Sequence, residues 1–281
     1  MKKGEFKVQL LKWIGNKQRF AHEIISYFPD NFNCFYEPFF GSGAVTATLM
    51  PSKGIGSDVF PPLMEIWSCL KSNPETIKDW YRTRWEFFVK NDKKVAYENI
   101  KLAYNENPNG ADLLFLSRTC YGGVMRFRKK DGYMSTPCGA HAPITPESFA
   151  KRVDIWRERL ANVSFMCCDY KKIFSYAQRG DLIYCDPPYM YSQSILYRGQ
   201  NFSFDDLISE IMKAKQRGVY IALSIDGIKK SGSLNCHLPI PTGLFKQELF
   251  VNTGKSMLKR FQMGGMTLEK EYVCDRLLLT Y

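Results

Sequence analysis

The chain has 281 residues, of which 45% are hydrophobic and 15% aromatic, so it can bury a sizeable core and is not globally disordered. The 39 Lys and Arg outnumber the 28 Asp and Glu, and the formal charge of +11 favours a polyanionic partner. No run of eighteen apolar residues occurs and the first residues do not resemble a signal peptide, so we expect a cytoplasmic protein without a membrane span.

The first 60 residues predict a β-α-β unit. A strand over residues 34–40 is followed by Gly41-Ser42-Gly43, which turns the chain into a helix from Ala44. A second strand over residues 54–58 ends in an acid. This order of elements is typical of nucleotide-binding α/β proteins.

Residues 61–160 carry mainly helical patterns. Helices are predicted over residues 74–89, 93–104, 111–121 and 146–160, with Pro or polar residues near their starts. Between the last two, residues 121–139 hold two β-prone arms around a basic Lys-Asp-Gly turn, which indicates a hairpin.

From residue 161 onward, strands and helices alternate again. Strands are predicted over residues 164–168, 181–185, 219–225, 248–252 and 272–280, with a helix over 204–217. We therefore expect an α/β fold in which one parallel-sheet domain (1–60 and 161–281) is split by a mostly helical insertion (61–160).

The strongest chemical signal is Asp186-Pro187-Pro188-Tyr189, which directly follows an apolar strand. Ligands of open α/β sheets bind at the carboxyl ends of strands. The prolines stiffen the loop, and the Asp186 carboxylate and the Pro187 carbonyl together can accept both protons of an exocyclic amino group. Tyr189 can stack on the base that carries this group. The alternative is a rigid turn in which the aspartate caps a helix.

A second signal follows the first predicted strand. The G-x-G of Gly41-Ser42-Gly43 lets the backbone approach a ligand closely, although alone it also fits a plain tight turn. Asp58, at the end of the next strand, can bind the two hydroxyls of a ribose. The chain has no G-x-x-x-x-G-K-[ST] phosphate loop, which argues against an NTPase.

These motifs occur in an order and spacing similar to those of Dam-type (class alpha) DNA adenine-N6 methyltransferases. The resemblance rests on Lys12-Trp13-Ile14-Gly15-Asn16-Lys17, Glu37-Pro38-Phe39-Phe40-Gly41-Ser42-Gly43-Ala44, Asp58 and Asp186-Pro187-Pro188-Tyr189, and it covers nearly the whole chain. It implies a Rossmann-like methyltransferase fold and S-adenosylmethionine as methyl donor, with S-adenosylhomocysteine as product and no metal.

The resemblance also implies the site residues. The catalytic ones would be Asp186, Pro187, Pro188 and Tyr189. The cofactor would be bound by Trp13, Lys17, Glu37, Phe39, Gly41, Gly43, Asp58, Asp169, Tyr170 and Asp186. Within this set, Glu37 and the glycine loop would lie beneath the methionine part, Asp58 would hold the ribose, and Asp169-Tyr170 would replace the family's Asp-Phe beside the cofactor adenine.

The basic hairpin resembles the family's target-recognition segment. The DNA-binding residues implied there are Tyr121, Arg126, Arg128, Lys129 and Lys130. An arginine can read guanine bidentately, whereas lysines neutralise phosphates. A solvated hairpin tip is the alternative interpretation. Relatives that modify GATC carry Asn at the positions of Gly122 and Arg128, so we do not expect GATC as the target.

The Pro137-Cys138 dipeptide is the one on which cytosine-C5 methyltransferases rely, but it follows no predicted sheet strand, so we do not expect a nucleophilic Cys138. The nine cysteines include no C-x-x-C pair and the three histidines lie far apart, so neither a disulfide framework nor a metal site is expected.

The function expected is methylation of the N6 amino group of a flipped adenine in double-stranded DNA, by a bacterial or phage-encoded enzyme. A cognate restriction endonuclease acting on the same site is a possible partner. Two alternatives stay open at this point: an RNA amino-group methyltransferase, and a catalytically silent DNA-binding protein of the same fold.

Overall fold

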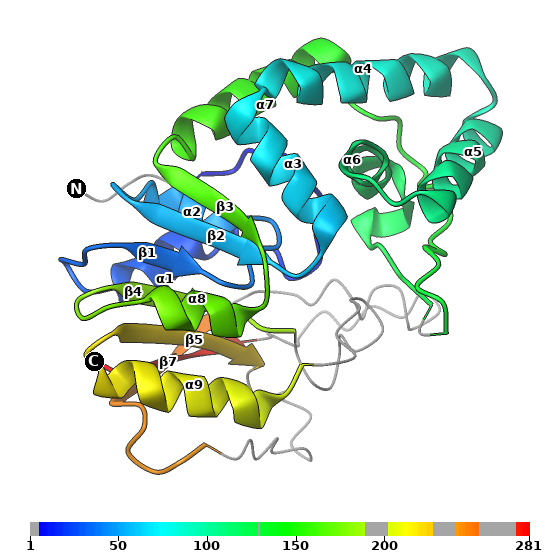
Figure 1. Ribbon diagram of the computed structural model, residues 1–281. Coiled ribbons are helices and arrows are strands. Elements are labelled where there is room, and N and C mark those ends of the chain that lie inside the picture. Colours follow the sequence, from blue (N-terminus) through cyan, green and yellow to red (C-terminus); the bar gives the residue numbers. More distant parts are fainter. Residues whose placement is uncertain (1–5, 129, 189–201, 227–239, 253–273) are drawn as a thin grey trace.

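One seven-stranded sheet organises the computed structural model, which describes residues 6–128, 130–188, 202–226, 240–252 and 274–281 (Figure 1). The strand order is β3-β2-β1-β4-β5-β7-β6. The first five strands in chain order are parallel: β1 (Phe35–Glu37), β2 (Gly54–Asp58), β3 (Val163–Cys167), β4 (Leu182–Cys185) and β5 (Tyr220–Asp226). β7 (Cys274–Leu279) differs from them and runs antiparallel between β5 and β6 (Gln247–Asn252).

The central strands are buried on both faces, and alternate residues face different helices. In β4, Leu182 and Tyr184 pack in one cluster with α1 (Ala21–Ser26) and α2 (Ala44–Leu49). Ile183 and Cys185 pack in another with α8 (Tyr170–Tyr176) and α9 (Phe204–Gln216). The apolar run at 182–185 therefore reflects burial on both sides.

Five helices lie between β2 and β3 along the chain and occupy one end of the sheet in Figure 1. They are α3 (Pro61–Ser72), α4 (Pro74–Lys90), α5 (Lys93–Glu106), α6 (Gly110–Thr119) and α7 (Pro146–Arg159). Side chains of Asn73, Asp92, Asn109 and Thr145 accept backbone N–H groups at the starts of α4 to α7, as the predicted boundaries require. Helix α6 is buried along its whole length and forms the centre of this bundle.

The segment 121–139, which we call the hairpin, pairs with itself. It begins with a 3-10 turn, η1 (Tyr121–Gly123), and isolated antiparallel bridges join Cys120 to Cys138 and Phe127 to Met134. The two arms of this segment meet through isolated bridges rather than regular strands. No helix among the described residues has the length and apolar character needed to cross a membrane.

Candidate active site

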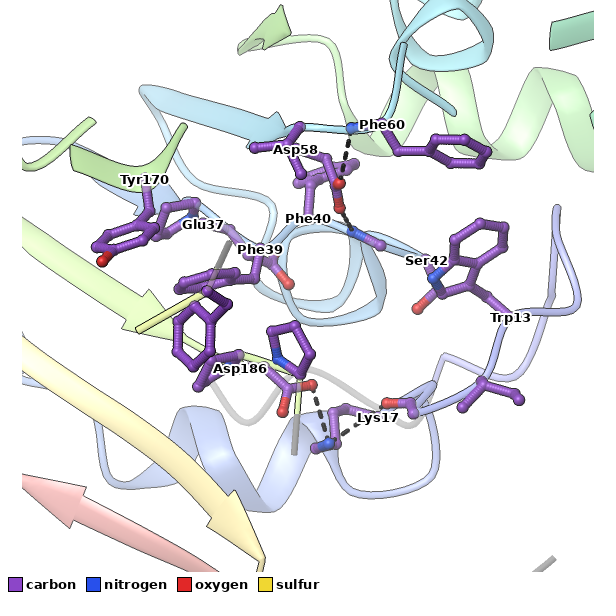
Figure 2. A pocket seen from close by; sticks show the side chains of 18 of the residues that line it. Trp13, Lys17, Glu37, Phe39, Phe40, Ser42, Asp58, Phe60, Tyr170 and Asp186 are labelled. Atoms are coloured by element: carbon purple, nitrogen blue, oxygen red, sulfur yellow. Dashed lines mark hydrogen bonds and ion pairs between the residues drawn. The ribbon is translucent and has the colours of Figure 1, made fainter. Parts of the chain in front are cut away.

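A cavity of about 510 Å³ opens at the carboxyl ends of β1, β2 and β4 (Figure 2). It lies where β1 is flanked by β2 on one side and β4 on the other, the switch point at which open α/β sheets bind ligands. Its wall contains most of the residues predicted from the sequence: Trp13, Lys17, Glu37, Phe39, Gly41, Asp58, Asp169, Tyr170, Asp186, Pro187 and Pro188. The fold thus brings together residues that precede the helical insertion in the sequence and residues that follow it.

The loop after β1 is shaped by two glycines in the left-handed region. Gly41 has φ 46° and Gly43 has φ 63°. Gly43 is the N-cap of α2 and does not line the cavity; a Cβ there would lie 2.6 Å from the ring of Phe40. The indole nitrogen of Trp67 in α3 donates to the Gly41 carbonyl at 3.1 Å, so the helical insertion also holds this loop.

Asp58, the last residue of β2, binds the loop that follows β1. Its carboxylate accepts the N–H groups of Gly41 and Phe60, each at 3.1 Å. Burial raises the pKa of Asp58 to about 6, against the lowering effect of these backbone hydrogen bonds. Each carboxylate oxygen has a second lone pair, so the group can still accept hydrogen bonds from a ligand.

Glu37 lies at the floor of the cavity and is 4% exposed. Its carboxyl accepts hydrogen bonds from the backbone N–H of Thr46, at 3.1 Å, and from the Thr46 hydroxyl. Burial raises the pKa of Glu37 to about 8, although the Thr46 hydrogen bonds act in the opposite direction. Glu37 is therefore largely protonated at neutral pH.

The Glu37 carboxyl should make stability fall with rising pH. The unfolded chain releases this proton near pH 4.5, whereas the folded protein holds it to about pH 8, so the free energy of unfolding decreases through this window. Glu37→Gln cannot titrate, and it should match the wild type at about pH 4, below the unfolded pKa, but melt at least about 2 °C higher at about pH 8.5. Thermal denaturation at both values, with the exposed Glu86→Gln as control, measures this. Parallel pH dependences of Glu37→Gln and wild type would contradict it.

Lys17 and Asp186 form an ion pair at 2.9 Å, drawn in Figure 2. Both side chains are largely buried, at 8% and 16% exposed. Lys17 also donates to the carbonyl of Gly15 at 3.4 Å. The sequence predicts both residues in the site but carries no signal for their pairing, because it depends on how the segment before α1 packs against the end of β4.

Aromatic rings form two parts of the cavity wall. On one side the ring of Phe39 stacks on Tyr170, with centroids 5.4 Å apart and planes at 29°, and Phe202 meets Phe39 edge-on. On another side, the ring centroids of Trp13 and Phe60 lie 6.3 Å apart. Such surfaces suit a flat heterocycle. Phe60 and Phe202 were not predicted, since single aromatics outside a motif are indistinguishable from core residues in a sequence.

The described side chains of the hairpin that were predicted to bind DNA, those of Tyr121, Arg126, Arg128 and Lys130, do not line the cavity. Tyr121 is half exposed, and Arg126 and Lys130 are exposed. Arg128 makes a bidentate ion pair with Asp131, at 2.8 and 3.1 Å, and its guanidinium lies 4.2 Å from the centre of the Tyr133 ring. Tyr189 and Lys129 lie outside the described residues.

Cys138 is placed in the insertion, not in the cavity, and burial raises the pKa of its thiol, opposite to what a nucleophile needs. Within the described ranges, no group of three or more His, Cys, Asp or Glu side chains is arranged to hold a metal ion.

Comparisons with known proteins identify the family. The model described as D12 class N6 adenine-specific DNA methyltransferase matches residues 13–242. The chain is 28% identical over 227 residues to the DNA adenine methylase of Vibrio cholerae, covering 76% of this chain and 79% of that protein. It is 29% identical over 242 residues to the type II methyltransferase M.MjaIII of Methanocaldococcus jannaschii, covering 76% and 82%. The solved rRNA methyltransferase AviRa of Streptomyces viridochromogenes, at 14% identity and a TM-score of 0.41 over 93% of this chain and 83% of that one, is too distant to inform the substrate.

The matched region begins at Trp13 and includes the glycine loop, Asp58 and the Asp-Pro-Pro-Tyr motif, so the same residues that line the cavity lie within the family match. The chain therefore belongs to the D12 class N6 adenine-specific DNA methyltransferase family and is a Rossmann-like enzyme that methylates adenine in DNA.

Proposed function

We propose that the cavity binds S-adenosylmethionine and that Asp186 holds the amino group of an adenine flipped out of duplex DNA. Members of this methyltransferase family in general use that methyl donor. The observation that carries the proposal is that Asp186, at the end of β4, opens into the same cavity as Asp58 and the aromatic walls. The proposed site of the methyl donor and the proposed site of the adenine amino group therefore belong to one cavity.

The cavity fits this cofactor in size and chemistry. Its volume lies within the range of about 300–1,000 Å³ that is usual for pockets binding small molecules. Asp58 is a carboxylate that can accept two ribose hydroxyls, and the stacked Phe39 and Tyr170 present ring surfaces to a purine. Glu37 and Gly41 line the floor, where the amino-acid part would lie.

The bound cofactor supplies a methyl group on a sulfonium, which is already a good leaving group. The chain's own residues provide position. The Asp186 carboxylate and the Pro187 carbonyl accept hydrogen bonds from the two N–H groups of the adenine amino group and direct its lone pair at the methyl group. The amino nitrogen loses one of its protons to solvent after the transfer. Lys17 fixes the carboxylate through the ion pair. Tyr189, outside the described residues, is proposed to stack on the flipped base.

Transfer of a labelled methyl group to duplex DNA, followed by detection of N6-methyladenine in digested DNA, tests the function. Structured RNA serves as the competing substrate. Labelling of RNA but not of duplex DNA would overturn the proposed substrate.

For the cofactor, Asp58→Ala should weaken S-adenosylhomocysteine binding by about 1.5–3 kcal/mol, the range for hydrogen bonds that involve a charged group. Asp58→Asn keeps one acceptor oxygen and so can keep one of the two contacts to the Gly41 and Phe60 amides, which bond to different carboxylate oxygens, and its loss should be smaller than that of Asp58→Ala. Calorimetry on both, with the exposed Asp79→Ala as control, gives the affinities. An unchanged affinity in Asp58→Ala would remove Asp58 from the site.

For DNA, Arg126→Ala should relax the methylated sequence at one position, with a loss of about 1–3 kcal/mol of discrimination. Lys130→Ala should weaken binding to all sequences alike and reduce the salt dependence of binding, because phosphate contacts carry no sequence information. Methylation profiling on a randomised duplex library compares the two variants. A full, unaltered preference in Arg126→Ala would place specificity elsewhere.

We further propose that residues 61–160 act as the target-recognition domain, with Tyr121 occupying the gap left by the flipped base, and that the enzyme is cytoplasmic. M.MjaIII is named a type II methyltransferase, which supports a restriction endonuclease with the same target as partner. Sequencing of modified bases in DNA from expressing cells would give the target site, and Gly122 and Arg128 lead us to expect one other than GATC.

A further inference from the structure

Phe127, from the hairpin, lines the cavity that we assign to the cofactor, and it is alone in this among the described hairpin residues. Its side chain is 7% exposed, whereas those of its neighbours Arg126 and Arg128 are exposed. This alternation is the pattern of an extended arm with one face buried. The ring therefore points inward from the same stretch of backbone that presents the two arginines outward.

Backbone pairing fixes this arrangement. The Arg128 N–H donates to the Tyr133 carbonyl and the Ser135 N–H donates to the Arg126 carbonyl, both at 2.9 Å. The Arg126 N–H donates to the Thr136 hydroxyl at 2.8 Å. Because residues 126–128 lie in one extended arm, a displacement of the backbone at Phe127 would also displace both arginines.

The ring is linked to the proposed ribose site through Phe60. Phe127 meets Phe60 edge-to-face with centroids 5.6 Å apart, and Phe60 lies 6.3 Å from Trp13. The N–H of Phe60 donates to the Asp58 carboxylate at 3.1 Å. Phe60 is therefore the single residue between Phe127 of the hairpin and the Asp58 carboxylate, which we assign to the ribose of the cofactor.

The ring also has space to move. A second cavity of about 410 Å³ shares Phe60, Pro61 and Phe127 with the first, and its far wall includes Asp131, Gly132 and Tyr133 at the hairpin turn. Phe127 and Phe60 thus form the partition between two cavities. Filling the first removes one of the two spaces open to the Phe127 ring.

We propose that Phe127 is a positioning residue that couples cofactor binding to DNA recognition. An occupied cofactor cavity fixes the ring, and the fixed ring fixes the arm that carries Arg126 and Arg128. This inference rests on the proposed cofactor site. Because coupling between two sites is reciprocal, DNA must tighten cofactor binding by the same factor by which the cofactor tightens DNA binding.

The test measures this factor in both directions. The Kd of S-adenosylhomocysteine is determined by calorimetry with and without saturating duplex, and the Kd of the duplex by fluorescence anisotropy with and without S-adenosylhomocysteine. We expect a wild-type factor of at least about fivefold, falling to about one in Phe127→Ala. Phe127→Leu, which retains an apolar side chain, should give an intermediate factor and covers the case in which the alanine variant does not fold.

Phe88→Ala is the matched control. Phe88 is an aromatic residue of the same insertion, 4% exposed, packed on Phe115 and absent from both cavity walls. It should lower stability but keep the wild-type factor. If wild type binds no S-adenosylhomocysteine, the cofactor site itself is wrong and the coupling fails with it. If wild type binds it but shows no coupling, or if Phe127→Ala keeps the wild-type factor, the cofactor site stands and the role of Phe127 is wrong.

Discussion

Asp186→Ala is expected to abolish methyl transfer, lowering kcat by about 10²-fold or more, while S-adenosylhomocysteine still binds within a few-fold of wild type. Removing one preorganised group that stabilises a transition state has effects of about this size. Most of the cavity wall that would contact the cofactor comes from other residues, among them Asp58, Phe39 and Tyr170. Catalysis and cofactor binding should therefore separate in this variant.

Single-turnover methylation and calorimetry on the same preparation measure the two effects. Because the substitution also leaves the buried Lys17 ammonium without its ion pair, Lys17→Met is the control that breaks the pair but keeps the carboxylate. Loss of activity in Asp186→Ala far beyond that in Lys17→Met assigns the chemistry to the carboxylate. Near-normal turnover in Asp186→Ala would show the mechanism to be wrong.

Gly43→Ala is expected to destabilise the enzyme by about 2–5 kcal/mol and to weaken cofactor binding. The left-handed φ of 63° costs a side-chain-bearing residue about 1–2 kcal/mol, and the new methyl group would lie 2.6 Å from the Phe40 ring, an overpacking that costs about 1–3 kcal/mol more. Phe40 is 1% exposed and packs on Trp67 and Phe165, so it cannot yield without disturbing the core.

Gly243→Ala separates the two causes. Gly243 also has a positive φ, 79°, but a Cβ there would have no described atom within 4 Å, so the substitution measures backbone strain alone. Chemical denaturation of both variants gives the free energies of unfolding. Equal losses in the two variants would mean that contact with Phe40 contributes nothing.

Elements with strong local signals were predictable from the sequence. Helices α4, α5, α6 and α7 lie within a few residues of their expected bounds because Pro or capping side chains mark their starts. Helices α1 and α8 were missed because six or seven residues span too few turns for a periodic pattern. Helix α3 was not predicted, although Pro61 and Pro62 mark its first turn.

Strand positions were predictable, as was the parallel direction of β1 to β5, but the antiparallel direction of β7 was not. The apolar stretch that became β7 has no local feature that distinguishes parallel from antiparallel pairing, and it pairs antiparallel with both β5 and β6. The same limit applies within the site. Motifs placed Lys17 and Asp186 in one cavity, but the ion pair between them and the position of Phe127 in the cavity wall are properties of tertiary packing.

The strand order also constrains how the chain can be made. β1 pairs with β4 and β2 pairs with β3, and both partners follow the helical insertion along the chain. A ribosome that has synthesised the first 160 residues has therefore made β1 and β2 but neither of the strands that flank them, and the pair has two open edges that can join other chains. The helices α3 to α7, which lie between β2 and β3 along the chain, have more local contacts and should fold sooner. Translation products that stop before residue 182 are thus expected to aggregate or be degraded rather than accumulate as folded fragments.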